Sequence, residues 1–346
     1  MLHCCRALTV VLLLLPLSGC YLMQAASGQM QIASKRKPID SVLSDPATPG
    51  QVRSRLEYAK AARDFASREL GLPDNASYRS YADVGRPYVV WNVFAAPEFS
   101  VEPRRWCFPI AGCVVYRGYF NQESARSYAR RMRRRGDDAT VGGVAAYSTL
   151  GHFKDPILNT MMGWSDAQLA ATLFHELAHQ VVYIPGDSEF NEAFATTVEE
   201  AGLDRWLISN GRARELEDWR VYRERQQEFI ELLLAAREKL RQLYASKLPE
   251  TEMRAKKAEA FGQLKFEYSQ LRAKWNGYTG YDGWFDRALG NAHLVSAATY
   301  HGCMPGFARL LNSVGGDLPR FYQEVKRVAG LPGEQRSREV CGEVSD

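Results

Sequence analysis

The sequence predicts a predominantly helical α+β fold with a small β-sheet and a long helical hairpin. β-Branched and aromatic residues gather in short segments between residues 88 and 150, and such segments favour strands. Most other segments favour helix, above all the stretch of charged and apolar residues at helical spacing over 210–275. A small β-rich part against a helical body defines this class.

Residues 1–19 have the features of a lipoprotein signal peptide. Arg6 supplies a positive charge, and Ala7 to Leu17 form an apolar run too short to span a bilayer as a stable helix. Cys20 directly follows Leu-Ser-Gly, which resembles a bacterial lipobox. We therefore expect Cys20 to become the lipidated first residue of the mature chain and its membrane anchor. A plain signal peptide cut nearby, with Cys20 incidental, is the alternative.

The residues after Cys20 bear on location. Gram-negative lipoproteins retained in the inner membrane usually carry Asp at the next position, which here is Tyr21. We therefore expect an outer-membrane lipoprotein that faces the periplasm. Residues 20–49 are polar, and we expect an irregular anchor and tether there.

The charge balance predicts no nucleic-acid partner, since Lys and Arg number 44 and Asp and Glu 40. The basic run Ala129–Gly136 is the exception, and we interpret it as the solvated end of a helix.

Cysteine usage agrees with export. The cysteines that remain beyond Cys20 are Cys107, Cys113, Cys303 and Cys341. An even number in an oxidising compartment predicts two disulfides. Proximity favours Cys107–Cys113 and Cys303–Cys341, although four cysteines allow three pairings.

The first half of the chain contains the predicted strands. A helix is expected over about 50–70, ended by Gly71. The predicted strands are 88–96, 113–120 and 139–150. A helix over 123–135 separates the last two. In the last strand, Gly142 and Gly143 indicate a bulge or a close backbone approach.

The second half is predicted to be helical. A capping box at Ser165 starts a helix that runs to about Tyr183, and a second helix runs from Asp187 or Ser188 to about Leu207. An antiparallel helical hairpin is expected over about 210–275, with helices and loops after it. The hairpin has two possible roles. It is either a structural scaffold with no part in the reaction, or an arm that contacts the substrate.

The segment "HELAH" supplies the strongest chemical signal. His175 and His179 lie four residues apart, so both imidazoles stand on one helix face and can reach one metal ion. Glu176 is rotated about 100° around the helix. It is therefore placed to take a proton from a metal-activated water. The alternative is a pair of helix-face histidines satisfied by hydrogen bonds.

Zinc catalysis requires three protein ligands and one open position. Glu192 lies in "NEAFA", among small residues that let two helices approach closely, and we predict it as the third ligand of one Zn²⁺. Glu199 falls near the same helix face as Glu192 and is predicted to accept the other N–H of a ligand histidine. An exposed helix acid is the alternative for Glu199. We also assign Asn191 to the residues that support the metal ligands without binding the ion themselves.

The order H-E-x-x-H, short turn, N-E-x-x-A resembles the gluzincin branch of zinc peptidases. More narrowly, Gly142–Leu158, Phe174–Gly202 and Gly315–Gly330 resemble the zinc aminopeptidase family of Gram-negative bacterial lipoproteins. The resemblance extends over most of the mature chain. It implies that residues 50–346 form one zincin-like catalytic domain of a lipid-anchored zinc peptidase. Such a protein would act as an aminopeptidase on peptide substrates.

The same resemblance suggests further roles and one departure. It implies that the strand around Tyr147 and Ser148 pairs with extended substrate, with a buried strand as the alternative. Tyr300 and His301, together with Tyr147, are candidate hydrogen-bond donors to the oxyanion. His152 stands where the family leads us to expect an aromatic residue such as Trp.

Two other functions are alternatives. The chain lacks a G-x-M-E-N segment of the kind that better-known aminopeptidases use to hold a free amine. An endopeptidase acting on cell-envelope proteins is therefore one alternative. A non-catalytic, zinc-stabilised lipoprotein that binds an envelope partner is the other.

Overall fold

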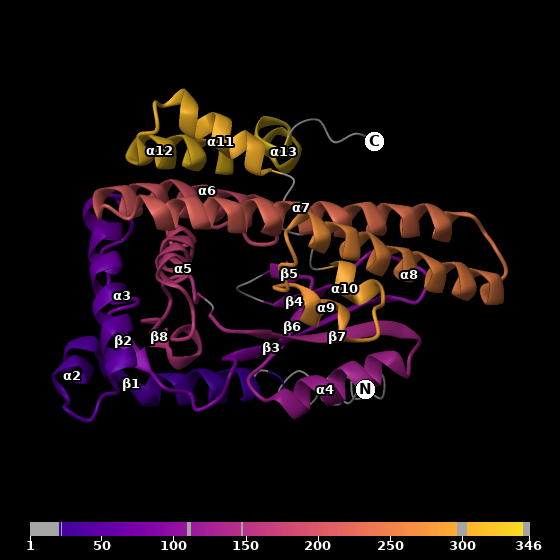
Figure 1. Ribbon diagram of the computed structural model, residues 1–346, viewed down its shortest axis with the longest axis horizontal. Helices are drawn as coiled ribbons and strands as arrows, with labels where there is room; N and C mark the ends of the chain where they lie inside the picture. The colour runs from indigo at the N-terminus through magenta and orange to yellow at the C-terminus, as the bar shows by residue number, and fades with distance from the viewer. Residues whose placement is uncertain (1–20, 22, 109–111, 147, 296–302, 342–346) are drawn as a thin grey trace, which may run out of the picture.

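The computed structural model describes residues 21–341 except 22, 109–111, 147 and 296–302. The chain is predominantly helical with small sheets, as the sequence predicts (Figure 1). Within the described residues, no helix combines the length and apolar content needed to cross a bilayer.

The N-terminal segment differs from the irregular tether expected over residues 20–49. Residues 23–35 are helical and lead into β1 (Arg36–Pro38) and α2 (Ile39–Ser44). Ile32, Ile39 and Val42 are buried in the main hydrophobic core. These few apolar residues gain their burial from distant parts of the chain, so local composition alone does not predict it. Cys20 lies outside the described residues.

Two small sheets carry most of the β-structure. In the first, β2 (Ser80–Ala82) lies between β1 and β8 (Ile157–Leu158). A 3₁₀ turn, Asn159–Met161, directly follows β8. In the second, β3 (Val90–Pro97) lies between β6 (Arg117–Tyr119) and β7 (Asp137–Val144), and all pairs are antiparallel. Helix α4 (Gln122–Arg133) packs on β3 and β7.

The predicted strand 113–120 is divided. Its first residues join β5 (Gly112–Val114), which pairs with β4 (Trp106–Phe108) and brings Cys107 and Cys113 into a disulfide. Its last residues form β6.

The strand β7 ends at Val144, well short of the predicted Leu150. Its register with β3 is continuous from Asp137 to Val144, so there is no bulge at Gly142 or Gly143. A Cβ on Gly143 would lie 2.4 Å from the Tyr88 ring. Close approach of an aromatic ring is therefore the reason for the glycine.

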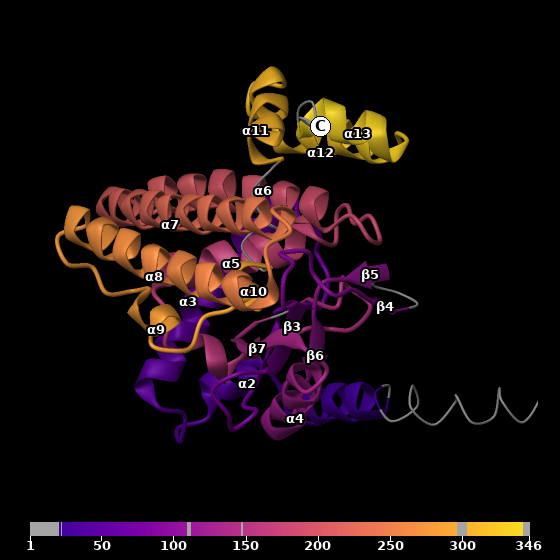
Figure 2. The same ribbon diagram turned by 90° about the vertical axis from the view of Figure 1, so that its right-hand side faces the viewer.

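The helical core is built on α3 (Gly50–Arg68), α5 (Asp166–Ala178) and α6 (Ser188–Ser209). The outer side of α6 is covered by α11 (Met304–Ser313), α12 (Leu318–Ala329) and α13 (Gly333–Val340) (Figures 1 and 2). A disulfide between Cys303 and Cys341 joins the start of α11 to the end of α13.

The predicted hairpin consists of α7 (Ala213–Ala245) and α8 (Glu250–Lys274), which we call the arm. Its own core includes Phe229 and Leu233 of α7 and Phe261 and Leu264 of α8. Two short helices, α9 (Asp282–Phe285) and α10 (Asn291–Val295), follow it.

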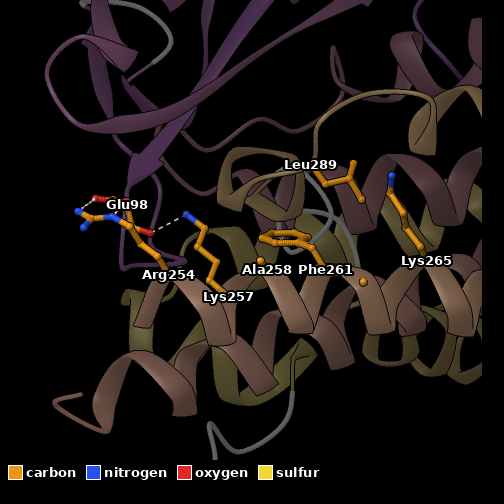
Figure 3. A pocket seen from close by; sticks show the side chains of 8 residues that line it. Glu98, Arg254, Lys257, Ala258, Phe261, Lys265 and Leu289 are labelled. Carbon is orange, nitrogen blue, oxygen red and sulfur yellow. Dashed lines mark hydrogen bonds and ion pairs between the residues drawn. The ribbon is translucent and has the colours of Figure 1, made fainter. Parts of the chain in front are cut away.

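The arm is fastened to the end of the β3–β7 sheet. Arg254 of α8 donates to the Glu98 carboxylate at 2.7 Å, and Lys257 lies 2.7 Å from Asp138. Lys257 also donates to the Glu98 carbonyl at 2.8 Å. Figure 3 shows Arg254 and Lys257 converging on Glu98 from one face of α8. Because these pairs link segments far apart in sequence, the arm is held against the body.

Candidate metal centre

The site lies where α5 and α6 meet. The Ser165 side chain caps α5 by accepting from the Gln168 N–H at 3.1 Å, as predicted. The helix ends at Ala178, earlier than the predicted Tyr183, so that His179 is its C-terminal cap residue. Asp187 then caps α6 by accepting from the Phe190 N–H at 3.2 Å.

Asn191 closes the turn between the two helices. Its side chain exchanges two hydrogen bonds of 2.8 Å with the backbone N–H and C=O of Ile184. It therefore fixes the path of the chain into α6. We predicted that Asn191 supports the metal ligands, but its side-chain hydrogen bonds go to the backbone of Ile184.

Three predicted ligand atoms converge at this corner. His175 Nε2 lies 3.2 Å from His179 Nε2 and 3.2 Å from Glu192 Oε2. His179 Nε2 lies 3.7 Å from Glu192 Oε1. Among the described residues these three side chains form one of two groups whose donor atoms could share an ion.

The second group contains Glu189 with Cys303 and Cys341. Its sulfurs are joined in a disulfide and are not thiolates, the form in which cysteine binds zinc. The histidine-containing group is therefore the better candidate.

The donor set fits zinc. Zinc binds imidazole nitrogen and carboxylate oxygen at about 2.0–2.2 Å with tetrahedral geometry, which places neighbouring ligand atoms about 3.3 Å apart. The distances between the His175, His179 and Glu192 donor atoms are close to this value. Two imidazoles and one carboxylate are also a ligand set of catalytic zinc sites, in which a fourth position stays open.

Glu199 contacts the first candidate ligand. Its Oε2 lies 2.9 Å from His175 Nδ1, on the side of the ring opposite Nε2. An acceptor there holds a proton on Nδ1, so that in the neutral imidazole the Nε2 lone pair is free for an ion. His179 Nδ1 has no such acceptor within the described part of the chain.

The carboxylates concentrate negative charge around the imidazoles. Burial lowers the pKa of His175, but hydrogen bonds to Glu192 and Glu199 outweigh it and hold this pKa well above its ordinary value. Burial and the nearby His175 lower the pKa of His179 to about 4. Burial opposes ionisation of Glu192, yet its hydrogen bond to His175 keeps the Glu192 pKa below its usual range. The centre thus favours a bound cation.

Glu176 has a different environment. Burial raises its pKa to about 7, with His175 opposing the rise and Glu192 adding to it. A carboxyl group with a pKa near neutrality can both accept and release a proton at physiological pH.

A cavity of about 510 Å³, which we call the arm cavity, adjoins the centre. His175, Glu192 and Glu199 form part of its lining, and the opposite wall comes from α7 and residues 281–284. The arm therefore borders the site, in addition to any role as scaffold.

Several predicted residues lie elsewhere. Tyr147, Tyr300 and His301 are outside the described residues. Ser148 is not in a strand, and its hydroxyl accepts from the Leu150 N–H at 3.0 Å in the loop after β7. His152 is exposed and lines a separate hollow with residues of the N-terminal helix.

Two tyrosines that the sequence reasoning missed lie near the carboxylates. Burial raises the pKa of Tyr116 to about 12, and the charges of Glu192 and Glu176 add to the rise. Burial and Glu192 also raise the pKa of Tyr183. Tyr116 lies between β5 and β6, far from the motif in sequence, so no spacing pattern could have connected it with the site.

The comparison with known proteins supports assignment of the chain to a peptidase family. No curated protein and no solved structure matches the chain significantly. A family model described as "Putative aminopeptidase" matches residues 20–340, which include every described residue of the centre. The chain therefore belongs to this aminopeptidase family.

Proposed function

We propose that the protein is a zinc-dependent peptidase that binds one Zn²⁺ through His175, His179 and Glu192. The observation that carries the proposal is the convergence of two imidazole nitrogens and a carboxylate oxygen at zinc-like spacings. The hydrogen bond from His175 to Glu199 supports it, because ligand histidines in zinc sites commonly have such a partner.

The residues of the chain divide the chemistry. When bound, zinc would polarise the peptide carbonyl and activate a water molecule. Glu176 accepts the proton of that water as the water oxygen attacks the carbonyl carbon. Glu176 then returns the proton to the departing amine as the C–N bond breaks. Its raised pKa suits both steps.

Tyr116 is our candidate for stabilising the oxyanion. Its hydroxyl stays protonated at physiological pH because its pKa is about 12, and it can therefore donate a hydrogen bond. Tyr300 and His301 were predicted for this role, and they stay candidates by sequence only.

We further propose aminopeptidase action, which the family description supports. Peptides with a free amino terminus and the same peptides with an acetylated terminus separate this from endopeptidase action. An aminopeptidase cleaves only the free set, one residue at a time. Internal cleavage of the blocked set would establish the envelope endopeptidase instead.

We also propose that Cys20 carries a lipid anchor in the outer membrane, with the domain in the periplasm. The two disulfides support an oxidising compartment. Labelling with a radioactive fatty acid should mark the wild type and not Cys20→Ser. Label on both proteins, or recovery of the wild type in the inner membrane, would contradict the assignment.

The deciding experiment compares wild type, Glu176→Gln and Glu189→Gln. Glu189 is an exposed acid at the start of α6 and serves as the matched control. We expect one zinc per chain in all three, and peptide-library hydrolysis in wild type and control only. Loss of the general base should lower kcat by roughly 10²–10⁴-fold. If zinc is bound but wild type cleaves nothing, a zinc-stabilised binding protein becomes the better account.

A further inference from the structure

We propose that the arm cavity receives a large apolar side chain of the peptide substrate, on a residue next to the scissile bond. This inference rests on the proposed function, because it places substrate at the centre formed by His175, His179 and Glu192.

The arm cavity lies beside the candidate centre. Gln168, Thr172 and His175 present one face of α5 to the cavity. Glu192, Thr196 and Glu199 present one face of α6 to it. The cavity thus runs from His175 and Glu192, two of the three candidate ligands, along both helices toward the arm. A peptide bond held at the centre would have a neighbouring side chain within reach of this space.

The far wall of the cavity is largely apolar. Most of the wall is aromatic or aliphatic: Trp219, Tyr222, Phe229, Ile230, Leu233 and Trp284. Burial of an apolar side chain against such a surface lowers the free energy of binding. A polar side chain buried there would lose its hydrogen bonds to water without gaining new ones. The volume of about 510 Å³ is in the range of small-molecule sites and accommodates the largest side chains.

The rings of that wall pack against one another. Phe229 stacks on Tyr281 with centroids 4.0 Å apart, and Trp284 meets Phe229 edge-on at 5.8 Å. Trp219 and Tyr222 lie 5.3 Å apart. These rings come from two segments that hold each other in place. A preformed apolar wall discriminates by size without reorganising.

Charge argues against an acidic side chain as the occupant. Arg223 is the cationic residue in the described lining, and its guanidinium donates to Glu200 at 2.7 and 3.1 Å. Gln226 accepts a further hydrogen bond from it. Because Arg223 is already paired with Glu200, the described lining offers an acidic side chain no free cationic side chain as a partner.

The test measures kcat/KM for peptides that differ only at the residues flanking the scissile bond. At one of these positions we expect wild type to favour Phe or Leu over Ala, and to disfavour Asp, by roughly tenfold or more. Gln226→Trp fills the cavity and should reverse the Phe-over-Ala preference. Tyr222→Ala should lower the rate for Phe while leaving Ala unchanged. Phe266→Ala, an exposed aromatic on the outside of the arm, is the matched control and should behave as wild type.

A binding measurement separates this inference from the proposed function. Peptides with Phe or Ala at the varied position are titrated into the zinc-loaded Glu176→Gln variant, with quenching of Trp219 and Trp284 as the signal. Preferential binding of the Phe peptide, lost in Gln226→Trp, supports the cavity even if wild type hydrolyses nothing. Equal binding of the two peptides, or a preference for Asp, overturns it even if hydrolysis is efficient.

Discussion

The candidate metal centre and the wall of the arm cavity adjoin each other but are built differently. The centre is polar, and its groups come from two consecutive helices, with His175 and Glu199 only 24 positions apart. The wall is apolar, and its rings come from α7 and from residues 281–284. We therefore expect changes in the centre to affect the chemical step and changes in the wall to affect substrate choice.

The largest effect should follow loss of a ligand. Glu192→Ala removes the only carboxylate of the candidate set and leaves two imidazoles, one buried (His179) and one half-buried (His175). We expect zinc content to fall well below one per chain and kcat to fall by roughly 10³-fold or more. Metal analysis and peptide hydrolysis on the same samples measure both. Asp204→Ala, an acid on the same helix paired with Arg220, should retain zinc and activity. Full zinc content in Glu192→Ala would mean that the third ligand is another residue.

Tyr116→Phe tests whether the chemistry extends beyond the two helices. The change removes one hydroxyl and keeps the ring, so zinc content and peptide binding should hold. If Tyr116 donates to the oxyanion, kcat falls by roughly 10²–10³-fold with little change in KM. Steady-state kinetics at saturating substrate give this split. A rise in KM alone would indicate that Tyr116 holds substrate in its ground state.

Glu199→Gln should have a smaller effect on the same centre. The amide keeps the size of the side chain, but it is a weaker acceptor for the His175 Nδ1–H. We expect metal affinity to fall roughly 10–100-fold. Competition with a chromogenic chelator measures this, and zinc in excess should restore most of the activity. An unchanged affinity would show that Glu199 only stabilises the packing of α5 against α6 and does not affect metal binding.

The sequence predicted the centre because its signals are local. The i, i+4 spacing of His175 and His179 and the cap at Ser165 depend only on neighbouring residues. The prediction of Glu192 and Glu199 required one further assumption, that two consecutive helices pack together. The predicted end of α5, at about Tyr183, was wrong: the helix ends at Ala178, and Asn191 from the next helix holds the backbone of Ile184 in the turn that follows.

The remaining features depend on contacts between distant segments. Ile32 and Ile39 are isolated apolar residues in a polar segment, and only the folded chain brings surfaces to cover them. The wall of the arm cavity exists because Phe229 stacks on Tyr281, a contact with no periodic signature. The arm predicted from composition was confirmed, but its place beside the centre could not follow from its composition.

His293 lies outside the candidate centre, and its burial predicts that acid weakens the fold around α10. It lies on α10, and its Nε2 is 3.0 Å from Thr140 Oγ1. Burial lowers its pKa to about 4. A histidine whose folded pKa is depressed contributes stability above its unfolded pKa of about 6.5, and that contribution is lost as pH falls toward 4.

Between pH 7 and pH 5 this loss amounts to about 2 kcal/mol. Asp155 acts with the opposite sign, because burial raises its pKa to about 6 and its carboxyl favours the folded state when protonated. Glu176, whose pKa is raised to about 7, acts in the same direction as Asp155. His179, whose pKa is lowered to about 4, acts in the same direction as His293. Raw stability against pH therefore mixes several groups. The informative quantity is the difference in urea-unfolding free energy between wild type and His293→Gln, measured in the metal-free protein. This difference should shrink by about 2 kcal/mol on going from pH 7 to pH 5. A constant difference would show that His293 is protonated equally in the folded and unfolded chains, and that its burial has no linked cost.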